Sequence, residues 1–89
     1  MPPHLTPHTP EWFSALEACN PAQAAITKQI VALAGRADVC SVCGDDSAKD
    51  YKLVGVQFGP NTAATIRLCD DCRQIRSKMH GESFSLLTP

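Results

Sequence analysis

Two pairs of cysteines constrain the fold of this chain more than any other feature. Cys40 and Cys43 form the first pair, Cys69 and Cys72 the second, and two residues separate the sulfurs within each pair. Two such turns supply the four thiolates of a tetrahedral structural zinc site. The alternatives are disulfides, which need an oxidising compartment, and a thioredoxin-like motif, which needs a βαβ unit. The sequence indicates neither, so we expect Zn²⁺ bound by these four cysteines.

The residues that follow each pair predict different local structures. Gly44 follows the first pair and can adopt the positive φ with which a zinc knuckle reverses the chain. Residues 73–80 follow the second pair and predict a helix that ends at Gly81. Asp70 and Asp71 precede them and suit an N-cap and first helical turn. We therefore expect the first pair on a knuckle and the second at the start of a helix.

The segment between the two pairs predicts a β-hairpin. We expect strands over residues 51–58 and 63–68, joined by the turn Gly-Pro-Asn at 59–61. In the first strand, alternation places three apolar residues on one face: Val54, Val56 and Phe58. Knuckle, hairpin and helix in this order, over residues 37–81, form the arrangement of a treble-clef zinc finger.

Two helix-start signals precede the knuckle. Thr-Pro at 9–10 and Asn-Pro at 20–21 each combine an N-cap residue with a proline at the first helical position. They predict helices over about 10–20 and 21–34, the second ended by Gly35. Two consecutive helices joined so closely predict an αα-hairpin.

The spacing of apolar residues predicts which side of each helix is buried. In the first helix the apolar stripe includes Trp12, Leu16 and Cys19, and we expect Cys19 to be a buried core residue. In the second helix we expect one buried face, made of Ala22, Ile26, Ile30 and Leu33. The opposite, polar side holds Gln23, Thr27 and Lys28. The helix predicted after the second cysteine pair has an apolar face made of Cys72, Ile75 and Met79.

The predicted fold class is a small α+β, metal-stabilised domain: a treble-clef zinc finger preceded by an N-terminal αα-hairpin. We divide the chain into a mobile proline-rich tail (1–9), the helical hairpin (10–36), the zinc module (37–81) and a C-terminal tail (82–89). His4 and His8 are expected to be solvated, because four thiolates already complete a zinc site. The C-terminal tail either folds back onto the core or docks on a partner.

Residues 40–79 resemble the treble-clef zinc-binding domain at the N-terminus of ClpX-type unfoldase ATPases. That resemblance implies a module that binds adaptors and substrates and forms dimers. The segments Cys-Ser-Val-Cys-Gly-Asp at 40–45 and Cys-Asp-Asp-Cys-Arg at 69–73 are also similar to the first zinc module of nuclear receptors. The pairs lie farther apart here, and Gln-Ile at 74–75 replaces the aromatic-rich start of the receptor recognition helix. Both resemblances rest mainly on the four cysteines and Gly44, and bear on fold more than on function.

Composition and charge exclude several classes of function. The formal net charge of −1 provides no global basic field for nucleic acid or an anionic membrane. No apolar run approaches the ~20 residues of a membrane span, and no cationic segment with an apolar stretch behind it marks a signal peptide. We therefore expect a cytoplasmic protein with reduced thiols and no membrane partner.

A site of four thiolates also argues against catalysis. It closes the coordination shell of zinc, whereas a catalytic zinc keeps a position open for water. Iron is the other metal to consider, but a rubredoxin-type site has glycine after the second cysteine of both pairs, and here Arg73 follows Cys72. We expect structural zinc, no enzyme activity and no small-molecule substrate.

Our first hypothesis for function is a protein-interaction module of adaptor or regulatory type, with a protein partner or a second copy of the chain. Its basis is the near-neutral charge and a surplus of large apolar residues for so small a core. The candidate partner surface comprises Trp12, Phe13, Phe58 and Phe84, with Leu86 and Leu87 in the C-terminal tail.

The alternative function is a small zinc-finger regulator that reads DNA or RNA through helix 70–80. Candidate contacts with nucleic acid are Arg67, Arg73, Arg76 and Lys78, with His80 at the end of the same stripe. Acidic residues balance these cations, and a four-thiolate zinc centre adds a charge of roughly −2. Nucleic acid is therefore the second choice of partner.

Overall fold

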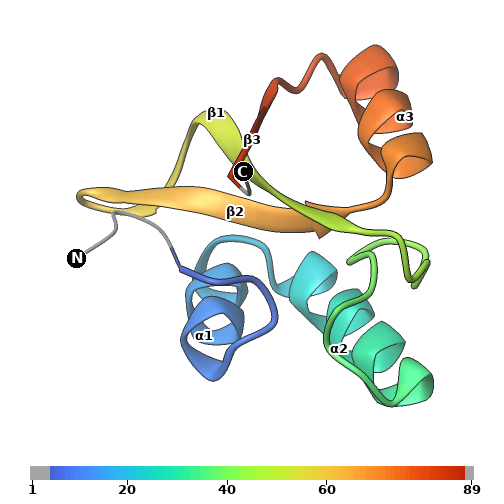
Figure 1. Ribbon diagram of the computed structural model, residues 1–89. Coiled ribbons are helices and arrows are strands. Elements are labelled where there is room, and N and C mark those ends of the chain that lie inside the picture. Colours follow the sequence, from blue (N-terminus) through green and yellow to red (C-terminus); the bar gives the residue numbers. More distant parts are fainter. Residues whose placement is uncertain (1–4, 88–89) are drawn as a thin grey trace.

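The structure, a computed structural model, describes residues 5–87, and within them the chain forms a small α+β domain (Figure 1). The strands make one antiparallel sheet in the order β2-β1-β3. In Figure 1, α1 and α2 lie below the strands and α3 lies above them. In chain order the elements are α1 (Pro10–Cys19), α2 (Pro21–Ala34), β1 (Lys49–Gly59), β2 (Thr62–Leu68), α3 (Asp70–His80) and β3 (Phe84–Leu86).

Local capping sets the bounds of the helical hairpin. The Thr9 side chain accepts a hydrogen bond from the backbone N–H of Trp12, and the Asn20 side chain accepts one from Gln23. Gly35 ends α2 in the left-handed conformation, with φ 71°. The predicted start of each helix and the end of α2 are confirmed.

The burial of α2 differs from the prediction at most positions, although Ile30 is half-buried and Lys28 is exposed as expected. Ala24 and Thr27 are buried, whereas Ile26 and Leu33 are 49% and 89% exposed. The Thr27 hydroxyl donates a hydrogen bond of 3.0 Å to the backbone carbonyl of Ser41 in the knuckle. Because the surface under α2 presents polar backbone groups, the helix turns Thr27 inward and leaves Ile26 and Leu33 of the predicted apolar face in solvent.

Cys19 is exposed, so its prediction as a core residue is wrong. Its thiol contacts only the carbonyl of Leu16, at 3.6 Å, among the hydrogen bonds of the described chain. Trp12 and Leu16 fill the core instead, together with Ala24 from α2. The apolar stripe of α1 stops before its last residue because the chain turns away there into α2.

The prediction of a solvated His8 is also wrong, because His8 packs against the knuckle. It is buried, with Nδ1 2.5 Å from the carbonyl of Ala37 and Nε2 2.7 Å from the hydroxyl of Ser41. The buried Ser41 hydroxyl and the carbonyl of Ala37, just before the knuckle, thereby gain a partner. His4 lies outside the described residues.

The β-hairpin is less regular than the sequence predicts. The pairs Lys52–Thr65 and Gln57–Ala63 leave residues 53–56 of β1 opposite a single residue of β2. Gly55, with φ 82°, lies within this bulge. The single apolar face predicted for β1 is therefore wrong. Val54 and Val56 are 56% and 48% exposed, because the bulge turns them out of the sheet.

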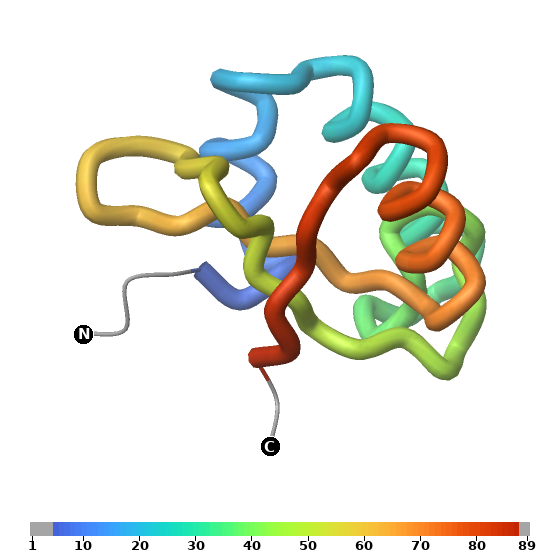
Figure 2. The backbone as a smooth tube through the Cα atoms, turned by 90° about the horizontal axis from the view of Figure 1, so that it is seen from above, coloured from blue at the N-terminus to red at the C-terminus, as the bar shows by residue number. Residues whose placement is uncertain are grey.

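The C-terminal tail folds back onto the sheet as β3. Its residues pair antiparallel with β1, with Phe84 opposite Leu53 and Leu86 opposite Tyr51. The rings of Phe84 and Tyr51 meet edge to face, with centroids 6.0 Å apart. Figure 2 shows this segment running from α3 across the strands. Of the two outcomes that the sequence left open, the structure has the fold-back.

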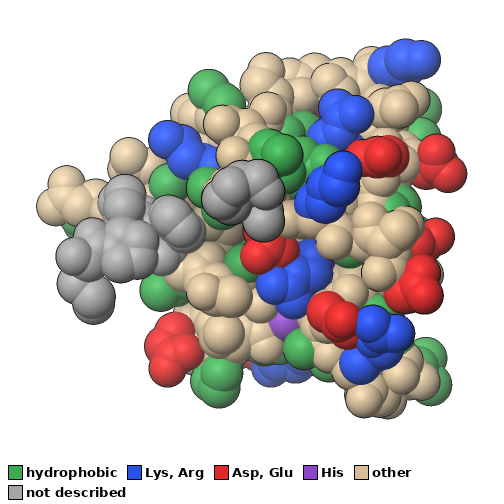
Figure 3. Space-filling model, in the orientation of Figure 1, with side chains coloured by type: hydrophobic (Ala, Val, Ile, Leu, Met, Phe, Trp, Pro, Cys, Tyr) green, Lys and Arg blue, Asp and Glu red, His purple; other side chains and the backbone are tan. Residues whose placement is uncertain are grey.

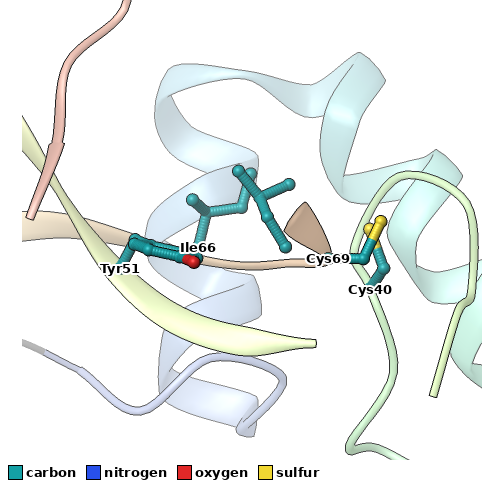
Figure 4. Close-up of a cluster of buried hydrophobic side chains, with 5 residues drawn as sticks. Cys40, Tyr51, Ile66 and Cys69 are labelled. Atoms are coloured by element: carbon teal, nitrogen blue, oxygen red, sulfur yellow. The ribbon is translucent and has the colours of Figure 1, made fainter. Parts of the chain in front are cut away.

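Two clusters of buried side chains stabilise the domain. One surrounds the cysteines and contains Tyr51, Ile66 and Leu68 (Figure 4). The other lies under the helical hairpin around Trp12, whose indole N–H donates a 2.8 Å hydrogen bond to the carbonyl of Thr65. That bond joins α1 to β2, and with it the two clusters.

The burial of His8 predicts a pH-dependent stability. Burial is the main reason that its pKa is lowered from 6.5, so the folded protein favours the neutral ring. As the pH falls through 6.5, the unfolded chain takes up a proton first, and stability present at higher pH is lost. We expect His8→Gln to be about 1–3 kcal/mol less stable than wild type near neutral pH, because buried partners lose a hydrogen bond.

The same variant should lose less stability than wild type between about pH 8 and about pH 5.5, since glutamine does not titrate. Urea unfolding of both proteins with saturating zinc measures this difference, and proton competition for the thiolates is common to both. If stability changes equally with pH in both proteins, His8 is not the group whose protonation destabilises the fold.

Candidate metal centre

The structure brings the four predicted cysteines together. Their sulfur atoms all lie within 4.8 Å of one another, and those of Cys43 and Cys69 are 3.6 Å apart. A zinc–sulfur bond of about 2.3 Å in a tetrahedron gives sulfur–sulfur distances of about 3.8 Å, so the cluster is close to the required size. Figure 4 shows Cys40 and Cys69 with their sulfur atoms adjacent.

The first pair lies on a tight turn. The N–H of Cys40 donates to the carbonyl of Asp45 at 2.8 Å, and the N–H of Gly44 donates to the carbonyl of Cys40 at 3.1 Å. Gly44 has φ 82°, as the reversal requires. A Cβ on Gly44 would also come within 3.3 Å of the Ile30 side chain of α2. Glycine here satisfies both the turn and the packing of the helix.

The second pair lies where β2 passes into α3. Cys69 is the N-cap of the helix, and no side-chain capping bond competes for its sulfur. Cys72 lies in the first turn, next to Asp70 and Asp71, which face the positive end of the helix dipole. The predicted acidic first turn is confirmed. The N-cap, however, is Cys69, and neither Asp70 nor Asp71 occupies that position.

The thiols interact strongly with one another. Burial raises the pKa of Cys40, but backbone N–H groups, including that of Val42 at 3.4 Å, outweigh it and bring the pKa to about 7. The pKa of Cys72 is raised well above its usual value by burial and by the neighbouring thiols. Burial also raises that of Cys43. Four thiolates at this separation need a cation to stay ionised together.

The chemistry of the donors fits zinc. Four thiolates suit tetrahedral Zn²⁺ or iron, and thiolates exclude hard cations such as Mg²⁺. The cysteines form no disulfide, since all of them are free. The Cys43 and Cys69 sulfurs are 3.6 Å apart, far beyond a sulfur–sulfur bond of about 2.05 Å. A thioredoxin-like motif is also excluded for residues 5–87, since all strand pairings there are antiparallel.

A buried polar network positions the knuckle, and the sequence did not predict it. Ser41 is fully buried, and its N–H donates to the carbonyl of Arg67 at 2.7 Å. Its carbonyl accepts from Thr27, and its hydroxyl contacts His8. This residue follows Cys40 directly, so the network sets the orientation of a ligand. Serine beside histidine also suggests a nucleophile and base, but a substrate cannot reach the buried Ser41 hydroxyl.

The candidate nucleic-acid residues do not form one free basic surface. Arg67 makes a two-pronged contact with Asp50, with its Nε 2.5 Å from one carboxylate oxygen. Arg76 donates to Glu82 at 2.9 Å. Arg73 lies over the ring of Tyr51, 5.9 Å from its centroid. Lys78 is exposed on α3.

The predicted apolar face of α3 is wrong, because Ile75 and Met79 are exposed. The sulfurs of Cys69 and Cys72 must both reach the metal, and this requirement sets the rotation of the helix. Arg76 lies one turn further along the side of α3 that carries Cys69 and Cys72, and it is half-buried. Ile75 and Met79 lie on another side of the helix.

The candidate partner surface is also largely inside the protein. Trp12 is fully buried, and Phe13, Phe58 and Phe84 are half-buried. The assignment of Trp12 to an exposed partner surface is therefore wrong, because its indole fills the core between α1 and the sheet. The large apolar side chains that reach solvent are a different set: Ile26, Leu33, Val42, Val54, Val56, Ile75, Met79 and Leu86.

No protein-family model, curated protein or solved structure matches this chain. The resemblances to the ClpX-type domain and to nuclear receptors therefore rest on the cysteines and Gly44 alone. The cysteine cluster supports a zinc-finger-like metal-binding module. Among residues 5–87, no helix is both long and apolar enough to cross a membrane.

The metal should be required for folding. We expect one zinc ion per chain, loss of the native circular-dichroism spectrum on chelation, and loss of zinc in Cys72→Ser, because three thiolates cannot close the shell. Cys19→Ser is the matched control and should retain zinc, since Cys19 lies outside the cluster. A spectrum that a chelator leaves unchanged would refute the metal centre.

The polar network should affect zinc retention from outside the ligand set. We expect Thr27→Val to destabilise the domain by about 0.5–1.5 kcal/mol, because the Ser41 carbonyl loses its shorter donor and keeps only Gln23, at 3.4 Å. Zinc transfer to a chromophoric chelator should also become faster. Thr27→Ser keeps the hydroxyl and is the control; equal losses in both variants would point to packing alone.

Proposed function

We propose that this chain is a treble-clef zinc finger whose metal is structural zinc, and that it acts in protein–protein interaction. The observation that carries the proposal is the convergence of four cysteine sulfurs, two from a knuckle and two from the start of α3, within 4.8 Å. The hairpin β1–β2 lies between them in the chain. Knuckle, hairpin and helix thus occur in the order of a treble clef.

The same cluster favours a structural role over catalysis. Four thiolates leave no coordination position for water or substrate. Within residues 5–87, no second group of three or more cysteine, histidine or acidic side chains lies close enough to hold another metal. We therefore propose that the protein is not an enzyme.

Charge supports a protein partner over nucleic acid. Arg67 and Arg76 are engaged with carboxylates, so two of the four candidate cations are already neutralised. The face shown in Figure 3 carries acidic and basic side chains interspersed, with no surface of a single sign. Nucleic-acid binding through α3 remains the alternative, and it has to compete with these ion pairs.

Exposed apolar side chains supply the positive argument for a protein partner. Ile75 and Met79 on α3 and Val54 and Val56 on β1 are large, apolar and exposed. Such side chains usually mark contact surfaces when they gather in one region. The partner in this proposal is another protein or a second copy of the chain.

A binding experiment with DNA separates the two functions. We expect the zinc-loaded protein to leave the fluorescence anisotropy of a labelled duplex unchanged at about 50 mM salt, where phosphate contacts are strongest. Size-exclusion chromatography of the same sample reports whether the chain associates with itself. An anisotropy increase that disappears by about 200 mM salt would reverse the ranking in favour of nucleic acid.

A further inference from the structure

An apolar pocket lies between the helical hairpin and the sheet. It has a volume of about 200 Å³, and its inner walls are Trp12, Leu16, Phe58, Ala64 and Ile66. An apolar cavity of about 150 Å³ engineered in another protein accommodates benzene. This pocket is therefore of a size for one leucine or phenylalanine side chain.

The pocket opens into a longer groove of different character. The groove has a volume of about 450 Å³ and shares Asn20, Leu53, Val56 and Arg76 with the pocket. It continues along residues 80–83, between the end of α3 and β3. A mainly apolar pocket joined to a larger groove of mixed polarity suits an elongated occupant with one apolar anchor.

The β1 bulge supplies backbone beside the groove. Residues 53–56 have no one-to-one partners in β2, and the pairing with β3 ends at Leu53. The N–H of Val54 is taken by the carbonyl of Ser83. Val56 lines the groove and lies beyond the residues that β3 pairs, so it has no β3 residue opposite it. An extended chain can add hydrogen bonds at such an edge.

Polar groups of the groove are also incompletely paired. Arg76 makes one side-chain hydrogen bond among the described residues, to Glu82. The other carboxylate oxygen of Glu82 is buried and has no hydrogen-bond partner within that part of the chain. The pair is neutral overall, and the remaining N–H groups of Arg76 can donate to an uncharged occupant that carries carbonyl acceptors. A peptide backbone carries them.

We propose that the pocket and groove bind an extended segment of a protein partner. One leucine or phenylalanine side chain fills the pocket, and the adjoining backbone lies against Val56 and Arg76. Residues 1–4 and 88–89 contain neither leucine nor phenylalanine, so they do not supply the anchor. This inference rests on the proposed protein-interaction function and specifies the chemistry of the partner.

Blocked amino acids test the proposal directly. The probes are N-acetyl-leucine, N-acetyl-phenylalanine and N-acetyl-alanine methylamides, added to zinc-loaded, ¹⁵N-labelled full-length protein. We expect saturable NMR shifts with the first two, at the indole N–H of Trp12, the one tryptophan of the chain, and at amides 53–58. Dissociation constants should be in the millimolar range, as for fragments of about this size. The alanine probe should give no saturable shift.

Val56 and Ile26 are similarly exposed, so lysine substitutions at these two positions form a matched pair of variants. Val56→Lys places a cation at the mouth of the pocket and should weaken the leucine probe by about tenfold, because the ammonium must be desolvated. Ile26→Lys changes a residue of similar exposure, 49% against 48%, that lines neither cavity, and should bind as wild type does. Ala64→Leu fills the pocket and should abolish binding, provided that its spectrum stays native.

Several results would overturn this assignment. Absence of shifts with either large probe, equal shifts with the alanine probe, or equal weakening in both lysine variants would each do so. Toluene is the comparison for a free apolar molecule: shifts with toluene but not with the blocked amino acids would assign the pocket to a small ligand. Each of these outcomes leaves the zinc content and the DNA result unchanged, so failure here is distinguishable from failure of the proposed function.

Discussion

The mutual repulsion of four converging thiolates is the constraint on which this structure depends. The cysteines come from a knuckle and a helix start that are far apart in sequence, and two of them, Cys40 and Cys69, are also members of the buried cluster. Structural zinc in zinc-finger peptides contributes on the order of 10–16 kcal/mol, about as much as the whole stability of a small domain. In a chain of 89 residues, a metal held by these cysteines would therefore tie the knuckle to the start of α3 within one buried cluster, as well as neutralise the thiolates.

The helical hairpin attaches to this centre by polar contacts more than by apolar burial. Thr27 and His8 both reach the residue after Cys40, and Trp12 reaches the carbonyl of Thr65. Each contact gives a buried backbone or hydroxyl group a hydrogen-bond partner, and Gln23 adds a second donor to the Ser41 carbonyl. Gln23 and Thr27 both reach that carbonyl from one side of α2, and with this side turned inward Ile26 and Leu33 remain in solvent.

The same argument applies to the surface near α3. The helix takes its rotation from the two cysteines at its start, so Arg76 turns toward β3 and meets Glu82. The bulge of β1 then leaves space between the helical hairpin and the sheet, and the pocket lies in that space. Metal geometry and strand register thus decide together where the molecule offers apolar surface to a partner.

The sequence by itself determined the metal ligands and nearly all helix bounds, because these depend on short-range signals. The two-residue spacing within each cysteine pair, the caps at Thr9 and Asn20, and the glycines at 35 and 44 act over one turn of chain. Only the tertiary structure decided which helix faces are buried, that His8 lies inside, and that residues 84–86 form β3. Those outcomes depend on which polar groups and cavities lie opposite each element, and residues distant in the sequence supply them.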